Sequence, residues 1–323
     1  MAEPGMPHID IAQTFGAMFI GALLTMSVYG ITTLQSYFYY QYYPKDGYGM
    51  KALVALIWIL DTLHVILMCH TMYHYLISGF GNVHMLAEGT WSLFASIAIN
   101  IIIAFVVQCF FTQRIFVLSP ERIKWWLSSI IGISVFAHFV FGLETVVFLF
   151  IKKEFARLNE LNYISVLPFG VTAILSDIFI ATALCFLLAS NRSDYEDTNT
   201  VINKLIVYAI NRCILTSAVA VIEVVIFVAV PHSFYSFAFD FIIGKLYANS
   251  FLATLNSRKS LWGKGQGDRS QATMSTSFRL ASLATHEQPA SVTRVRSRDS
   301  GAKGQRRVHS RDVESKMDTM STL

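Results

Sequence analysis

Long apolar runs occupy most of the first 254 residues, and they do not alternate apolar with polar residues as barrel strands do. A helix needs roughly 20 mainly apolar residues to cross the hydrocarbon core of a bilayer. Within lipid, a helix also satisfies its own backbone hydrogen bonds. The pattern therefore predicts an all-α integral membrane bundle of seven transmembrane helices. The expected spans are residues 11–40, 50–77, 91–113, 125–151, 165–189, 201–230 and 234–254.

Residues 255–323 follow a different pattern, rich in Ser, Thr, Gly and Arg and without any apolar run. They carry 13 Lys and Arg against 6 Asp and Glu, a net charge of +7, whereas the whole chain carries +4. Such a segment cannot bury enough apolar surface to fold alone. We therefore expect a transmembrane domain over residues 1–254 and a disordered basic tail over 255–323.

Composition and charge distribution support a membrane location. Hydrophobic residues make up 54% and charged residues 14% of the chain, whereas a soluble domain carries about a quarter charged residues. Lys and Arg concentrate in the loops on one side, apart from the loop "KKEFARLNELN". The positive-inside rule then predicts an outer or lumenal N-terminus and a cytoplasmic C-terminus, in the plasma membrane or an endomembrane.

The basic tail suggests its own partners. Positive charge beside a membrane attracts anionic lipid, and phosphorylation of Ser282 in "RLAS" or Ser310 in "RRVHS" would weaken that attraction. A solvated tail that only enforces topology is the simpler alternative. Because the basic charge belongs to a flexible segment at a membrane, we expect no nucleic-acid partner.

Five ionisable residues fall near the middle of their spans, and they are expected to form an intramembrane polar site. A central Asp or Lys costs about 2.5–3.5 kcal/mol on an insertion scale, so these groups should pair inside the bundle. We predict an ion pair between Asp61 and Lys245. Such a pair could serve a ligand or proton site, or it could only fix the helix register. The five residues are Asp61, His64, His138, Asp177 and Lys245.

The second span, "WILDTLHVILMCHTMYHYL", also carries three histidines. His70 and His74 are four residues apart and share a helix face, with His64 close to it, so the three could hold a metal. His64 and His138 could instead ligate a haem from two helices. Interhelical hydrogen bonds are the simpler interpretation, and we expect no cofactor.

A stripe of small residues, Ala17, Gly21 and Thr25, repeats every four residues in the first span. Small residues allow two helices to approach closely in a membrane. In a multi-span protein this pattern favours a contact inside the bundle over a dimer interface.

Two segments carry a family resemblance: "SDIFIATALCFLLASNRSDYEDTNTVINKLIVYAINRCILTSAVAVIEVVIF" and "GKLYANSFLATLNSR". They resemble fungal multi-pass membrane proteins, common in mushroom-forming species, that contain domain of unknown function 6534. The resemblance covers residues 170–258 most specifically, and "LDTLHVILMCHTMYHYL" is similar to the usual N-terminal half. Arg212 is a departure, because family members often have a small residue there. The resemblance implies a seven-span membrane protein and supplies no catalytic residue.

Three functional hypotheses follow. The first is a receptor-like or sensory protein that binds an unidentified small molecule at the polar midplane and signals through its tail. The second is a proton-coupled transporter that uses Asp61, Asp177 and Lys245. The third, a metal or haem redox protein, depends on the histidines alone. Nothing resembles a nucleotide-binding loop, a nucleophile elbow or a zinc-protease helix, so we do not expect an enzyme.

Overall fold

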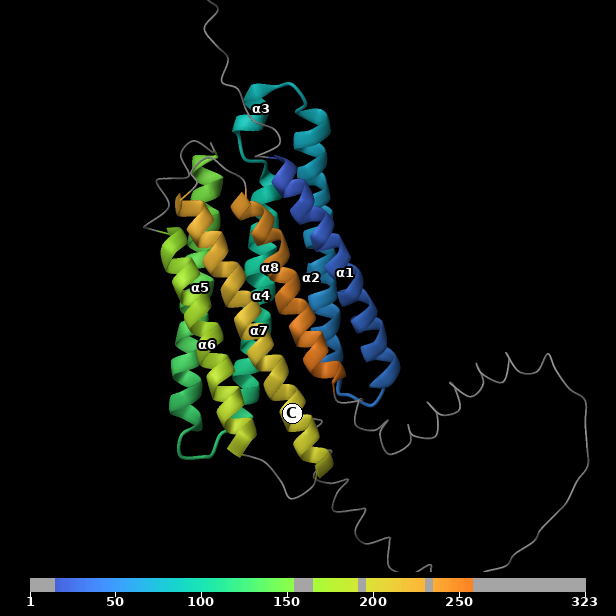
Figure 1. The fold of residues 1–323 in the computed structure, drawn as a ribbon, viewed down its shortest axis with the longest axis vertical. Helices are drawn as coiled ribbons and strands as arrows, with labels where there is room; N and C mark the ends of the chain where they lie inside the picture. Colours follow the sequence, from blue (N-terminus) through green and yellow to red (C-terminus); the bar gives the residue numbers. More distant parts are fainter. Residues whose placement is uncertain (1–14, 154–164, 191–195, 230–234, 258–323) are drawn as a thin grey trace, which may run out of the picture. The chain divides into compact units, whose positions relative to one another are not determined.

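A computed structural model describes residues 15–153, 165–190, 196–229 and 235–257. The chain divides into two units, Met1–Ser257 and Arg258–Leu323, and every described residue belongs to the first. Over the described residues the fold is all-helical (Figure 1). The helices are α1 (Ala17–Tyr42), α2 (Tyr48–Tyr73), the π-helical turn η2 (His74–Ser78), α3 (Val83–Ala87), α4 (Trp91–Leu118), α5 (Lys124–Lys152), α6 (Leu167–Ser190), α7 (Glu196–Ala229) and α8 (Tyr235–Asn256).

The long helices coincide with the seven apolar runs, but only six qualify as candidate membrane spans by length and composition. These six are α1, α2 with η2, α4, α5, α6 and the Leu205–Phe227 part of α7. Helix α8 has 22 residues, which is long enough, but it contains Asp240, Lys245 and several Ser, Thr and Asn residues. The predicted count of seven spans is therefore not confirmed by composition.

The long helices form one bundle, in which α4 lies between α2 and α5. On the side away from α4, α1 packs against α2, α5 against α6, α6 against α7, α7 against α8, and α8 against α1. Helix α4 contacts α2, α5, α6 and α8, and it is the most buried of the six candidate spans. Its sequence is apolar on nearly all sides, as expected for a helix surrounded by other helices. It ends at Leu118 because Ser119, which precedes Pro120, adopts an extended conformation.

Helix α8 runs alongside α1 in the same direction. A Cβ atom at Gly21 would lie 2.8 Å from the backbone of Ala238, so these two helices touch through the small-residue stripe. Further along, Lys245 Nζ lies 5.5 Å from the centroid of the Tyr29 ring. Near the end of both helices, Tyr43 donates a hydrogen bond to the Asn256 carbonyl at 3.1 Å. The predicted internal contact of the stripe is thus present at Gly21.

The outer surface of the bundle is strongly apolar. Ile133 and Phe186 are 70% and 69% exposed, and many large apolar side chains of α1, α2, α5, α6 and α7 are similarly exposed. A soluble monomer rarely shows apolar patches larger than a few hundred Å². The surface is therefore consistent with a lipid environment, which supports an integral membrane protein.

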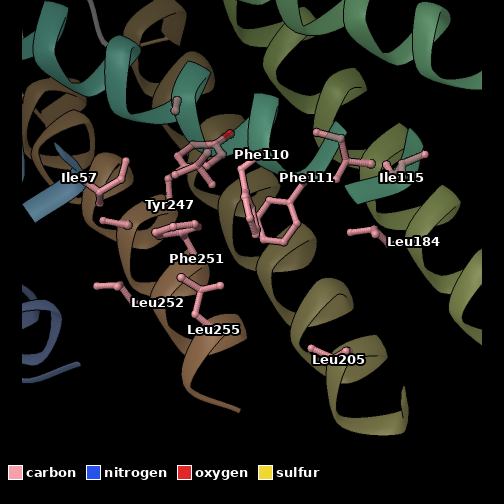
Figure 2. Packing of buried hydrophobic residues seen from close by; sticks show 14 of the residues in the cluster. Ile57, Phe110, Phe111, Ile115, Leu184, Leu205, Tyr247, Phe251, Leu252 and Leu255 are labelled. Carbon is pink, nitrogen blue, oxygen red and sulfur yellow. The ribbon is translucent and has the colours of Figure 1, made fainter. Parts of the chain in front are cut away.

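Inside the bundle, the buried apolar residues form two clusters, and buried polar residues lie among and between them. One cluster contains Ile57, Phe110, Phe251 and Leu255 and is drawn in Figure 2. The other contains residues nearer the opposite ends of the same helices, such as Met68 and Phe237. Buried polar residues lie between them in sequence on several helices, for example Asp61 and His64 between Ile57 and Met68 on α2. We use "polar layer" for the buried residues Asp61, His64, Asn100, Gln108, His138, Asp177, Arg212, Thr216, Asp240 and Lys245.

Candidate functional site

The first part of the polar layer is an ion pair between α2 and α8. Lys245 Nζ contacts Asp61 Oδ1 closely and donates a second hydrogen bond to the Asp61 backbone carbonyl at 2.9 Å. Both side chains are completely buried. The predicted pair is therefore present. It fixes α8 against α2 because the ammonium is held by the side chain and the main chain of one residue.

Some buried polar atoms of α1 and α2 lack a hydrogen-bond partner within the described part of the chain. Asp61 Oδ2, both ring nitrogens of His64 and the Thr25 hydroxyl are buried and accept or donate no hydrogen bond among the described residues. The His64 ring meets the Phe241 ring edge to face, with centroids 6.1 Å apart. Buried polar atoms in proteins are nearly always bonded, so this region has unused capacity to bind a polar group.

The second part is a network centred on Asp177 of α6. Arg212 of α7 donates to Asp177 Oδ1 at 2.8 Å, and both side chains are almost fully buried. The guanidinium also lies over the Phe111 ring, with its Cζ 4.5 Å from the centroid. An arginine stacked on an aromatic face while paired with a carboxylate is held in one orientation.

Three further side chains donate hydrogen bonds to the Asp177 carboxylate. Thr216 and Tyr247 donate to Oδ2 at 2.5 and 2.7 Å, and the Gln108 amide donates to Oδ1 at 3.0 Å. These donors come from α7, α8 and α4, so one carboxylate ties four helices together. A carboxylate that accepts several hydrogen bonds and faces a cation is well stabilised inside a bundle.

His138 joins this network from α5. Its Nδ1 lies 3.0 Å from Gln108 Oε1, and the Gln108 amide nitrogen already donates to Ser176 and Asp177. Because Oε1 can only accept, His138 Nδ1 carries a proton. In the neutral imidazole Nε2 is then an acceptor. The ring is stacked on Phe169, with centroids 5.1 Å apart.

A cavity of ≈ 40 Å³ lies beside this network, between α4, α5, α6, α7 and α8. A single water needs about 10–15 Å³ by the same kind of measure, so the space suits a few waters or a small molecule. The polar residues that line it are Asn100, His138, Glu223, Asp240 and Tyr247. Ile101, Ala104, Val166, Phe169, Gly170, Ala173, Ala220, Val224 and Ile243 form the rest of the wall.

Asn100 and Asp240 meet at this cavity. The Asn100 amide nitrogen donates to the Asp240 backbone carbonyl at 2.7 Å and to its Oδ2 at 3.3 Å. Asn100 Oδ1 is buried and has no hydrogen-bond partner among the described residues. The absence of a side chain at Gly244 leaves room for Asn100 Oδ1, since a Cβ atom on residue 244 would lie only 2.0 Å from this oxygen.

The five residues predicted to form one polar site lie in two separate groups. Asp61, His64 and Lys245 belong to the α2–α8 pair, whereas Asp177 and His138 belong to the network with Arg212. Sequence reasoning missed Gln108, Thr216 and Tyr247, because depth along a helix gives no rotation about its axis. Asn100 could have been suspected as an amide in a very apolar span.

The expected metal and haem arrangements are not assembled. Over the described residues, no group of three or more His, Cys, Asp or Glu is placed to hold a metal. His64 is fully buried, whereas His70 is exposed and bonds Ser92 through Nδ1 at 2.8 Å. The α-helix also changes to a π-helical turn at His74. A haem between His64 and His138 is disfavoured because α4 packs against both α2 and α5, and His138 already bonds Gln108.

Ser282 and Ser310 lie outside the described residues. Their phosphorylation and the tail's contact with anionic lipid stay predictions.

Comparison with known proteins gives one match. Residues 173–260 match a family of unknown function, domain of unknown function 6534. The matched segment contains most of α6 and all of α7 and α8, and hence Asp177, Arg212 and Lys245. No curated protein and no solved structure matches the chain. The chain is therefore similar, over its last three helices, to proteins whose activity is itself unassigned.

Proposed function

We propose that this chain is a seven-span receptor-like or sensory membrane protein, with its N-terminus outside and no enzymatic activity. The cavity beside Asp177 would hold a small-molecule ligand, and the segment after residue 257 would carry the signal. The observation that supports this proposal most is the position of the cavity. Five helices line it, and two lining residues, His138 and Tyr247, bond into the network that ties α4, α6, α7 and α8 together.

A ligand in such a place would couple binding to helix packing. A group that competes for Tyr247 or His138 would change the hydrogen bonds on Asp177 and so the fit of α6 against α7. A ligand shifts a conformational equilibrium only through a difference in its contacts with the two states. A ligand that replaces a hydrogen bond of His138 or Tyr247 in the network would bind the two states with different contacts.

Thermal unfolding of the full chain in lipid nanodiscs tests the proposal. We would titrate ethylammonium, ethanol and acetate, which carry different charges at nearly equal size, into the native protein and into Ala173→Leu. Ala173 lines the cavity, so the leucine fills it. At least one probe should raise the unfolding temperature of the native protein and leave that of the variant unchanged. Equal responses in both proteins, or none, would contradict a ligand site in this cavity.

A proton-coupled transporter is the second candidate. Glu223 and Asp240 line the cavity, and no Lys or Arg of the described chain forms an ion pair with either of them. Carboxylates of this kind are typical of proton relays in membranes. Uptake of the stabilising probe into proteoliposomes under a pH gradient would favour transport. Binding without uptake would favour the receptor.

A further inference from the structure

Acidic side chains outnumber basic ones around the cavity. The polar layer and the cavity wall hold four carboxylates: Asp61, Asp177, Asp240 and Glu223. Lys245 pairs with the first and Arg212 with the second. Asp240 and Glu223 remain, and over the described helices neither has a cationic partner. They lie close enough to interact electrostatically, so a bound cation would stabilise their ionised forms.

The uncharged groups at the cavity point to the same chemistry. Asn100 is 3% exposed. Its amide nitrogen is used by Asp240, which leaves the buried Oδ1 as an acceptor without a donor. Burying an acceptor without a donor is unfavourable. Asn100, Asp240 and Glu223 therefore supply three acceptor groups from the residues of the cavity wall.

The rest of the wall is apolar and aromatic. Phe169 and Tyr247 present ring systems to the cavity, and aliphatic side chains such as Ile101 and Val224 complete it. Aromatic faces attract cations, more strongly when water is excluded. An apolar wall favours a ligand with a hydrocarbon part over a hydrated inorganic ion.

We propose that the cavity binds a small protonated primary amine, with its ammonium held by Asp240, Glu223 and Asn100 and its alkyl part against Phe169. A primary ammonium has three N–H donors and no acceptor, which matches the three acceptors. The volume of ≈ 40 Å³ accommodates about three non-hydrogen atoms, the size of ethylammonium. This inference rests on the proposed function, because it names the ligand class of the same cavity.

The test measures binding of ethylammonium to the full chain in nanodiscs at pH 7.4, where an alkylamine is protonated. Ionic strength is held constant with N-methylglucammonium chloride, whose cation is too large for the cavity. Saturation-transfer NMR on the unmodified protein should detect ethylammonium, with a dissociation constant on the order of 1 mM as expected for three heavy atoms. Ethanol, of equal size and no charge, should give a signal at least tenfold weaker.

Variants then assign the site. Glu223→Gln and Asp240→Asn should each weaken ethylammonium binding at least tenfold. Glu144→Gln should leave it unchanged, since Glu144 also lies in a membrane helix but not in the cavity wall. If both cavity variants fail to fold, the comparison of ethylammonium with ethanol on the native chain still decides the ligand class.

Failure of the amine proposal can be distinguished from failure of the proposed function. Binding of ethanol or acetate that is lost in Ala173→Leu would overturn the amine while keeping a ligand site in the cavity. Equal binding of sodium ions in place of ethylammonium would overturn the organic cation. No cavity-dependent binding by any probe would overturn both the amine and the proposed function.

Discussion

Arg212 of α7 and Asp177 of α6 form an ion pair at 2.8 Å inside the bundle, and both side chains are withdrawn from the surface. Breaking a buried pair leaves an uncompensated charge, whereas keeping it costs desolvation of both groups. The desolvation is offset here by Gln108, Thr216 and Tyr247, which complete the carboxylate. The network therefore holds α4, α6, α7 and α8 in one register.

Thr216→Val tests the strength of this network. Valine keeps the shape of threonine but removes the hydroxyl that donates to Asp177 Oδ2 at 2.5 Å. Because hydrogen bonds to charged groups contribute about 1.5–3 kcal/mol, the free energy of unfolding should fall by about that amount. Unfolding by denaturant in bicelles measures it.

Thr254→Val is the matched control. Thr216 and Thr254 both donate to the carbonyl four residues earlier in their helices, at 2.9 and 2.8 Å, but Thr254 donates to no carboxylate of the described residues. The Thr254→Val control should lower the free energy of unfolding clearly less than Thr216→Val does. Equal losses would mean that the bond to Asp177 contributes little.

Asp61 and Lys245 should behave as a self-contained pair. Asp61→Leu or Lys245→Met alone leaves one buried charge and should lower the free energy of unfolding by about 3–5 kcal/mol. The double variant Asp61→Leu with Lys245→Met removes both charges and should recover most of the loss. A double-mutant cycle in bicelles measures the coupling.

The same variants show whether the Asp61–Lys245 pair has a structural or a functional role. If the double variant is stable and binds the cavity probes normally, the pair only fixes helix register. If it is stable and no longer binds them, the pair acts at the ligand site. Additive losses in the cycle would contradict a direct pair.

Gly244→Ala should displace the Asn100 amide. The new Cβ would lie 2.0 Å from Asn100 Oδ1, so the side chain must move and lose its bonds to Asp240. Overpacking of this kind costs about 1–3 kcal/mol. The unfolding temperature should fall, and the cavity probes should bind more weakly. Gly132→Ala is the control on α5, where a Cβ meets nothing within 4 Å, and it should be neutral or slightly stabilising because alanine favours the helix.

Gly21→Ala should separate α1 from α8. Its Cβ would meet the backbone of Ala238 at 2.8 Å, and a backbone cannot rotate aside as a side chain can. We expect a loss of about 1–3 kcal/mol in unfolding free energy. Gly30→Ala on the same helix adds a Cβ in open space, so stability equal to that of Gly21→Ala would show that the close approach is unimportant.

The sequence alone predicted the helices well and their contacts only in part. Each apolar run is a helix because backbone hydrogen bonds within the segment suit an apolar stretch of that length. Asp61 and Lys245 could be paired because both are charges of opposite sign near the middle of their spans. The Arg212–Asp177 pair was not predicted, because position along a helix does not show which neighbouring helix a side chain faces.

Irregular backbone was harder to predict than apolar length. The π-helical turn at His74–Ser78 and the short helix Val83–Ala87 lie where the second run was expected to end. The rings of His70 and His74 still stack, with centroids 6.5 Å apart, so the predicted shared face of these two residues is present despite the turn. The Asn82 side chain caps the start of the short helix by accepting hydrogen bonds from the backbone N–H groups of His84 and Met85. Such local capping is visible in a sequence only when the helix is already known.

Helix α8 should cross the membrane despite its charges. It follows α1 in the same direction, from Gly21 and Ala238 at one end to Tyr43 and Asn256 at the other, and α1 is a candidate span. Its charges face inward: Lys245 is completely buried and Asp240 nearly so. A helix that lies along a full span and hides its charges has the same depth in the bilayer as its neighbour.

Labelling single cysteines from each side of sealed membranes tests this crossing and the orientation together. In a background with the four native cysteines replaced by serine, Phe80→Cys and Tyr235→Cys should react with an impermeant maleimide from outside. Tyr48→Cys and Ser260→Cys should react only from inside. Labelling of positions 235 and 260 from the same side would mean that α8 does not cross. Reversal of all four would keep seven spans but place the N-terminus inside, because the sidedness of every loop alternates along the chain.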